Sequence, residues 1–298
     1  MALTPSFIGV QIFNGLVWGM VLGLIALGLS VIFGMLDVVN FAQGTMYTIG
    51  AYCGYSIILS FVFLLGSGQG GLCVALVVAP LVVALLSIII EVYLLRPIYS
   101  WGHVYHIMLT FGLALIGTEV VRLIYGSTPM SFPTPGIFKG VVSVGSIYYP
   151  KYRLFVFVLT VVILAIVWLF LDRTKYGTIV RAGIEDAEMV NILGINIKRL
   201  FSLVFGFGAA LSGVAGVLGG PILGSIQPDI GEHMGIYTFI IVVMGGLGSL
   251  SGAIVGAILL GLVKSVMEMI WAPASNVTMF ILMAVILVIR PQGLMGKR

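Results

Sequence analysis

The stretch GLVWGMVLGLIALGLSVIFG at residues 15–34 decides the fold class. It closes an uncharged apolar run over residues 7–34, and about 20 helical residues suffice to cross about 30 Å of hydrocarbon. Similar runs recur along the chain, so the sequence predicts an all-α, polytopic integral membrane protein of about eight or nine transmembrane helices with broken or re-entrant segments. The expected spans are 7–34, 45–65, 72–95, 107–126, 153–171, 200–220, 236–248, 252–271 and 278–290.

The composition excludes most other classes of protein. Of 298 residues, 60% are hydrophobic and 8% are charged, whereas soluble domains carry about 25% charged residues. An ordinary water-soluble enzyme and a disordered chain are both excluded, because so apolar a chain cannot remain solvated. The net charge of +4 is interpreted as a topology signal and does not indicate nucleic acid. We expect one transmembrane domain over residues 1–298, surrounded by membrane lipid.

The distribution of cations predicts the orientation. Cytoplasmic loops are enriched in Lys and Arg, so the loop at about 172–199 and the C-terminal tail are expected in the cytoplasm. Counting spans backwards places Arg96 on the same side, and the N-terminus and the loop at 127–151 outside. Eight of the 14 cations lie in these two segments: Arg173, Lys175, Arg181, Lys198, Arg199, Arg290, Lys297 and Arg298.

Small residues recur every four positions in several spans. The chain contains 40 glycines, and a four-residue period places each set on one helix face, where small residues let helices approach closely in lipid. These sets therefore predict tight helix packing. They are Gly15, Gly19 and Gly23; Gly208, Ser212, Gly216 and Gly220; and Gly252 with Gly256.

Residue patterns for catalysis, nucleotide binding and metal binding are missing from the sequence. There is no G-x-x-x-x-G-K-[ST] loop, so any ATP that drives this protein is expected to bind another chain. His103 and His106 are three residues apart without a third ligand nearby, which predicts no metal site. We expect no enzymatic activity and no cofactor in this chain.

Polar side chains interrupt the apolar pattern between the first two spans. Asn40, Gln43 and Thr45 lie there in a short segment that begins at Asp37. Polar groups at membrane depth are costly unless they face a cavity or satisfy exposed backbone. The segment is therefore either part of the solute path, with these three side chains as hydrogen-bond partners, or an ordinary cytoplasmic turn.

Two charge pairs occupy positions where hydrocarbon is expected. Lys264 and Glu268 are four residues apart in the span at 252–271, and Glu119 and Arg122 are three apart in the span at 107–126. Ionisable residues inside a membrane suggest function, but such spacings also allow the charges to neutralise one another on a helix face. We favour structural pairing near the span ends.

The loop at about 172–199 contains one further helical pattern. Apolar residues from Ile184 to Leu193 predict a short amphipathic helix, for which Gly194 is a suitable C-terminal cap. Such an exposed helix either docks into a groove on a soluble partner or lies on the inner membrane surface.

Three stretches together resemble the permease subunits of branched-chain amino acid ABC importers of the LivH type. The first is ALGLSVIFG at 26–34 followed by NFAQG at 40–44, and the second is RAGIEDA at 181–187 followed by LGI at 193–195. The third is GGLGS at 245–249 with RPQGL at 290–294. The resemblance covers nearly the whole chain, and the order and spacing of the three stretches make it specific.

The resemblance implies a bacterial inner-membrane subunit that moves branched-chain amino acids. A second, similar permease, two ATPase subunits that hydrolyse ATP with Mg²⁺, and an extracytoplasmic solute-binding protein are the implied partners. The implied coupling residues are Arg181, Glu185, Asp186, Ala187, Gly194 and Ile195.

The residues of the polar segment do not identify the exact solute. Gln43, Thr45 and Asp37 depart from the family pattern Asn-Phe-Ala-His-Gly-Glu and from its usual glycine. Relatives of similar sequence carry urea, short amides or aromatic acids, which gives the first alternative. An ion-coupled secondary carrier is the alternative of another class, whereas an intramembrane enzyme would need a paired nucleophile and base that we do not find.

Overall fold

The computed structural model describes residues 5–65, 69–144 and 147–296 and is helical through most of them. Within this part, nine apolar helices of 15 residues or more follow one another, which confirms the all-α class. They are α1 (Pro5–Leu36), α2 (Gln43–Leu65), α3 (Gln69–Ile90), α4 (His103–Tyr125), α5 (Lys151–Arg173), α8 (Ile197–Leu223), α9 (Ile230–Gly245), α10 (Leu250–Trp271) and α11 (Ser275–Ile289).

Seven segments of the described chain are long and apolar enough to cross a membrane. The last of them, Leu250–Ile289, bends at the 3₁₀ turn η4 (Ala272–Ala274), where Pro273 disfavours a continuous helix, and so forms α10 and α11. Helix α9 has only 16 residues. The sequence also predicted a short helix here, but the helix begins six residues before the expected 236.

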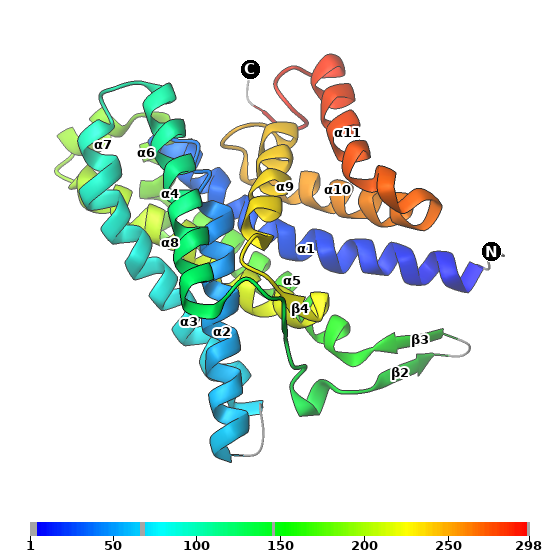
Figure 1. Cartoon of the computed structure of the whole chain (residues 1–298). Coiled ribbons are helices and arrows are strands. Elements are labelled where there is room, and N and C mark those ends of the chain that lie inside the picture. Colours follow the sequence, from blue (N-terminus) through cyan, green and yellow to red (C-terminus); the bar gives the residue numbers. More distant parts are fainter. Residues whose placement is uncertain (1–4, 66–68, 145–146, 297–298) are drawn as a thin grey trace.

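Helix α1 is the central element of the bundle. In the most apolar stretch of α1, 78% of the residues are buried inside the bundle. The corresponding share for α4, which lies at the edge, is 17%. It contacts α5, α8, α9 and α10, and Figure 1 shows α10 running beside it. An uncharged, glycine-rich helix suits this place, since it has no polar face that requires solvent.

The small-residue stripes lie where helices touch, as the sequence predicted. A Cβ built on Gly15 would lie 2.8 Å from the carbonyl oxygen of Gly261, and one on Gly19 would lie 2.8 Å from that of Ala257. On α8, a Cβ at Gly208 would lie 2.6 Å from the oxygen of Gly28. The backbones of α1, α8 and α10 are thus in direct contact, which only glycine permits at these positions.

We expect Gly19→Ile to destabilise the protein strongly. The new side chain would meet the backbone of α10, and overpacking of this kind typically costs about 1–3 kcal/mol or more. The melting temperature of the purified protein in detergent measures the effect. Gly112→Ile is the control, because nothing lies within 4 Å of a Cβ there. Equal melting temperatures for the two variants would contradict the assigned packing.

One end of the bundle carries four short strands, and we call it the strand end. Strand β1 (Met130–Ser131) pairs with β4 (Ser225–Ile226), and β2 (Val141–Val144) pairs with β3 (Ile147–Pro150). The Tyr149 hydroxyl donates to Asn14 Oδ1 at 2.8 Å, which ties this loop to the start of α1. The sequence predicted a loop here but not its strands.

The opposite end gathers the cationic segments, and we call it the basic end. Arg96, after α3, donates to the carbonyl oxygen of Lys198 at the start of α8. The segment after α11 returns to the α9–α10 turn, where the Leu294 amide donates to the Met244 oxygen. Arg96, the loop after α5 and the chain end therefore share one side, as predicted. Lys297 and Arg298 lie outside the described residues.

Candidate functional site

The loop after α5 forms two short helices, so the amphipathic helix predicted from Ile184 to Leu193 is present only in its second part, and the separate first helix was not predicted. Helix α6 (Lys175–Glu185) is followed directly by α7 (Ala187–Ile192). Asp186 separates them because its side chain accepts a hydrogen bond from the Met189 amide at 2.9 Å and so caps the second helix. Gly194, with φ of 85°, follows the end of α7 as expected.

Helix α6 is packed against the bundle and does not project from it. Gly183 faces Met35 at the end of α1, and Ile184 lies beside Gly34. The Arg181 guanidinium forms an ion pair with Asp172 at 2.7 Å, which fixes α6 to the end of α5. Ile184, assigned from the sequence to the exposed helix, therefore belongs to the packed one.

Helix α7 and the turn after it form the exposed tip of the loop. The side chains of Met189, Ile192 and Leu193 are 52%, 77% and 72% exposed, whereas Val190 is buried. A cavity of about 440 Å³ beside them is lined by Gly194 and Ile195, among others. We call Met189, Ile192 and Leu193 the apolar tip.

The predicted coupling residues are thus divided between two elements. Arg181 and Glu185 lie on α6, Asp186 is the cap between the helices, and Gly194 and Ile195 follow α7. Ala187 begins α7, and its side chain lies outside the described residues. Ile192 and Leu193 belong to the apolar pattern from which the sequence predicts this helix, whereas Met189 was not predicted.

A cavity of about 760 Å³ opens at the basic end behind α6. Its lining includes Gly34, Arg181 and Glu185 on one side and Gly248 and Ser249 of the α9–α10 turn on the other. Helix α6 contacts α1, α5 and α8. A displacement of α6 would therefore act on those three helices and be accommodated by the cavity.

The segment between α1 and α2 is buried in the bundle. The Gln43 amide donates to the Gly208 oxygen at 2.9 Å and lies 2.6 Å from Ser212 Oγ, both on α8. Asn40 Nδ2 donates to Gln43 Oε1 at 3.3 Å, and the Thr45 hydroxyl donates to the Ala114 oxygen of α4 at 3.2 Å.

The burial of these side chains argues against one of the two hypotheses for the segment, the ordinary cytoplasmic turn. Asn40, Gln43 and Thr45 are at most 4% exposed, so an ordinary exposed turn does not describe them. Their polar groups are satisfied by contacts within the chain, and those of Gln43 and Thr45 join α2 to α8 and to α4. The structure brings Asn40 and Gln43 together, whereas Thr45 faces α4 separately.

The two charge pairs predicted from the sequence are present near the strand end. Lys264 Nζ lies 3.2 Å from Glu268 Oε1, and Arg122 pairs with Glu119. Arg122 also pairs with Asp229, which the sequence analysis did not anticipate and which links α4 to the segment before α9. Both ion pairs predicted from the sequence are therefore confirmed. The second partner of Arg122, Asp229, also connects α4 to the segment before α9.

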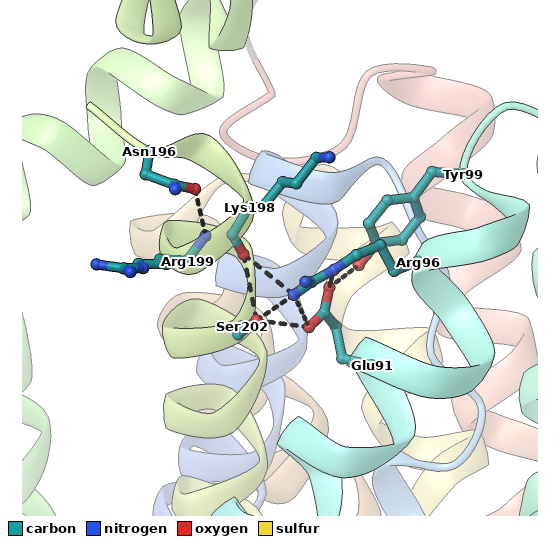
Figure 2. Close-up of polar contacts among 7 residues, drawn as sticks. All are labelled: Glu91, Arg96, Tyr99, Asn196, Lys198, Arg199 and Ser202. Atoms are coloured by element: carbon teal, nitrogen blue, oxygen red, sulfur yellow. Dashed lines mark hydrogen bonds and ion pairs between the residues drawn. The ribbon is translucent and has the colours of Figure 1, made fainter. Parts of the chain in front are cut away.

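A buried carboxylate at the basic end was not predicted. Glu91 is fully buried, and its two oxygens meet Arg96 at 3.1 and 2.7 Å. Tyr99 donates to the same carboxylate at 2.9 Å, and Ser202 Oγ of α8 lies 2.6 Å from it. Figure 2 shows these side chains converging between the end of α3 and the start of α8.

The local backbone makes this cluster possible. Residues Glu91–Leu95 form the π-helical turn η1, which brings residues five positions apart onto one face, so Arg96 faces Glu91. Burial, and then the Glu91 charge, raise the pKa of Tyr99, which keeps its hydroxyl protonated as a donor. An acid inside an apolar run, with a cation five residues later, is a signal of such a pair, but only Arg96 was interpreted, as a topology marker.

The two histidines near α4 have structural contacts. His106 Nε2 lies 2.9 Å from the Ile98 oxygen, and His103 lies 3.4 Å from the Asp37 carboxylate. Within residues 5–65, 69–144 and 147–296, no group of three metal-binding side chains is found.

Comparison with known proteins identifies similar chains over nearly the full length. A family model described as "Branched-chain amino acid transport system / permease component" matches residues 11–289. The high-affinity branched-chain amino acid transport system permease protein BraD of Pseudomonas aeruginosa is 32% identical over 293 residues, which cover 96% of this chain and 95% of BraD. LivH of Escherichia coli K12 is 30% identical over 295 residues, with the same coverage. No solved structure matches significantly.

Proposed function

This chain belongs to the branched-chain amino acid transport system permease family, and we propose that it is the permease subunit of an ATP-driven importer of branched-chain amino acids. The observation that carries the proposal is the family match over residues 11–289, together with two relatives of at least 30% identity named as permeases for this solute class. A permease of this family works with other transporter subunits, and the chain is a multi-pass membrane protein.

The proposed assembly contains a second, similar permease chain that completes the path. Two ATPase subunits hold ATP and Mg²⁺, and an extracytoplasmic binding protein delivers the solute at the strand end. The basic end then faces the cytoplasm of a bacterial cell, in agreement with the enrichment of cations in cytoplasmic loops. The lack of a G-x-x-x-x-G-K-[ST] loop in this chain supports an ATPase on separate subunits.

The apolar tip is the part of this chain that we propose seats in the ATPase. Ile192 and Leu193 are 77% and 72% exposed in a loop whose other exposed residues are mainly polar. Exposed apolar side chains on a short helix fit a hydrophobic groove of a partner. A helix lying on the membrane surface is the competing arrangement, and aspartate at Ile192 and Leu193 distinguishes the two.

Movement of the tip would reach the bundle through α6. Ion pairing of Arg181 with Asp172 fixes α6 to α5, and Gly183 fixes it to α1. Because Asp186 caps α7 directly after α6, the two short helices are joined without a flexible linker. Closure of the ATPase dimer would thus tilt α1, α5 and α8 as a group and open the path inward. No bond in the solute changes.

The buried segment at residues 40–45 is our proposed place for the path inside the bundle. Phe41 contacts Phe239 of α9 and Phe111 of α4, with ring centroids 5.4 and 6.5 Å apart. These rings form an incompletely buried apolar surface beside Asn40, Gln43 and Thr45. An apolar amino acid side chain can pass along such a surface.

Uptake by reconstituted proteoliposomes tests the proposal. We expect labelled leucine to accumulate only when the second permease, the ATPase subunits with ATP and the loaded binding protein are all present. This chain alone should be inert under any ion gradient, because it contains no chain of acids for proton relay. Gradient-driven uptake by the chain alone would overturn the proposal in favour of a secondary carrier. Uptake of urea or an aromatic acid in place of leucine would reassign the solute.

A further inference from the structure

Two adjoining cavities of about 340 and 330 Å³ open at the strand end. Both are lined by Trp18 of α1, Leu223 of α8 and Lys264 of α10, so they form one recess, which we call the vestibule. The first cavity extends towards α5 and the second towards α9 and α11. The vestibule therefore lies among six helices at the end where solute would arrive.

A largely buried ammonium group lies inside the vestibule. Lys264 is only 15% exposed, and its Nζ lies 5.0 Å from the centre of the Tyr237 ring and 5.8 Å from that of Trp18. The faces of aromatic rings attract an ammonium group. The Glu268 carboxylate also lies 3.2 Å from Lys264 Nζ. The lysine thus faces the recess at a depth where an unpaired charge would be costly.

The vestibule carries a net positive charge. Arg153 lines the same cavity as Lys264 and Glu268 and donates to Asn14 Oδ1. No ion pair between Arg153 and a described carboxylate lies within 4.0 Å. Two cations therefore face one carboxylate, and the other polar groups of the cavity, such as the Gln11 and Asn14 amides, are neutral. An incoming anionic group is favoured here.

We propose that the vestibule is a subsite for the charged head of a free α-amino acid. Lys264 and Arg153 attract its carboxylate, and Glu268 with the faces of Trp18 and Tyr237 receives its ammonium group. A zwitterion can replace the internal Lys264 and Glu268 pair with equivalent contacts, so that neither charge is left unpaired. The inference rests on the proposed function and specifies which part of the solute this chain recognises.

Cysteine accessibility in the complete transporter tests the subsite without requiring transport. Ser225 is exposed and lines the second cavity, so Ser225→Cys is introduced after Cys53→Ala and Cys73→Ala remove the native thiols. We expect an anionic methanethiosulfonate to react about tenfold faster than a cationic one, and Lys264→Met to abolish this preference. Leucine at millimolar concentration should slow the reaction, whereas 3-methylbutylamine, which lacks the carboxylate, should not.

Several results would overturn the subsite. They are equal protection by leucine and the amine, no protection by either, or protection that depends only on phosphatidylglycerol in the vesicles, which would indicate a lipid headgroup.

Uptake assays separate this inference from the proposed function. Lys264→Met should lower leucine uptake about tenfold, and Lys264→Arg should restore most of it. The exposed Lys139→Met is the control. If leucine protects the thiol of the Ser225→Cys transporter but is not imported by the unmodified transporter, the proposed function fails and the subsite stands.

Discussion

Replacing Ile192 and Leu193 together by aspartate is expected to abolish ATP-driven leucine uptake by the assembled transporter. The two side chains are 77% and 72% exposed, so the change does not disturb the core. We expect both side chains to be hot spots of the interface, and truncation of a hot-spot residue costs about 2 kcal/mol or more. A carboxylate forced into an apolar groove adds a desolvation cost. We expect a loss of about 4 kcal/mol in binding, or roughly a thousandfold weaker association with the ATPase subunits.

Co-purification of the ATPase subunits with the tagged permease measures this effect directly, and solute-stimulated ATP hydrolysis measures its consequence. The matched control is Ile137→Asp, which places a charge on a residue of similar exposure, 60%, at the strand end. That variant should retain the ATPase. Unchanged co-purification of the tip variant, with wild-type hydrolysis, would show that α7 is not the docking element and would favour a helix on the membrane surface.

The cap at Asp186 allows the shape of the tip to be tested separately from its chemistry. Asp186→Asn retains a capping side chain, whereas Asp186→Ala removes the contact with the Met189 amide and costs about 1 kcal/mol of local stability. If α7 acts as a preformed element, the alanine variant should couple less well than the asparagine variant.

The positions of the helices could be predicted because they depend on local sequence. A long uncharged run must form a helix in lipid whatever surrounds it, and α1, α5 and α10 lie close to the expected spans. Helix α9 is the instructive exception. Its first turns contain Gly231, Glu232, His233 and Gly235, which lower the local hydropathy, but Gly231 is required by close contact with Gly44 of α2, where a Cβ would lie 2.7 Å from the Gly44 oxygen.

Contacts between distant parts of the chain could not be predicted from local pattern. Gln43 meets Gly208 across 165 positions, and Arg122 meets Asp229 across 107. In both cases the residue type indicated a need for a partner, but nothing in the sequence of one segment identified the other. The division between α6 and α7 was not predicted for a different reason. The apolar pattern from Ile184 to Leu193 predicts one continuous helix across Asp186, although Asp is favoured at a helix N-cap and disfavoured in a helix interior.

Glu91→Ala is the variant for which we expect the largest loss of stability. Glu91 is fully buried, and its removal leaves the Arg96 guanidinium, the Tyr99 hydroxyl and Ser202 without their common acceptor. Breaking a buried pair by removing one partner costs about 3–5 kcal/mol. With about 2–4 °C per kcal/mol, the melting temperature should fall by of order 10 °C. Differential scanning fluorimetry in detergent measures it.

Two further variants show whether the cost arises from the orphaned cation. Glu119→Ala breaks an exposed pair and should change the melting temperature by only a few degrees, since exposed pairs contribute about 0–1 kcal/mol. Glu91→Met with Arg96→Met removes both charges, and because apolar replacement of a buried pair is often nearly neutral, it should recover much of the lost stability. If the double variant were less stable than Glu91→Ala, the hydrogen bonds that Arg96 keeps with the Lys198 oxygen and Ser202 Oγ would outweigh the cost of its unpaired charge. Arg96 would then hold α3 to α8 through these hydrogen bonds and not through its ion pair.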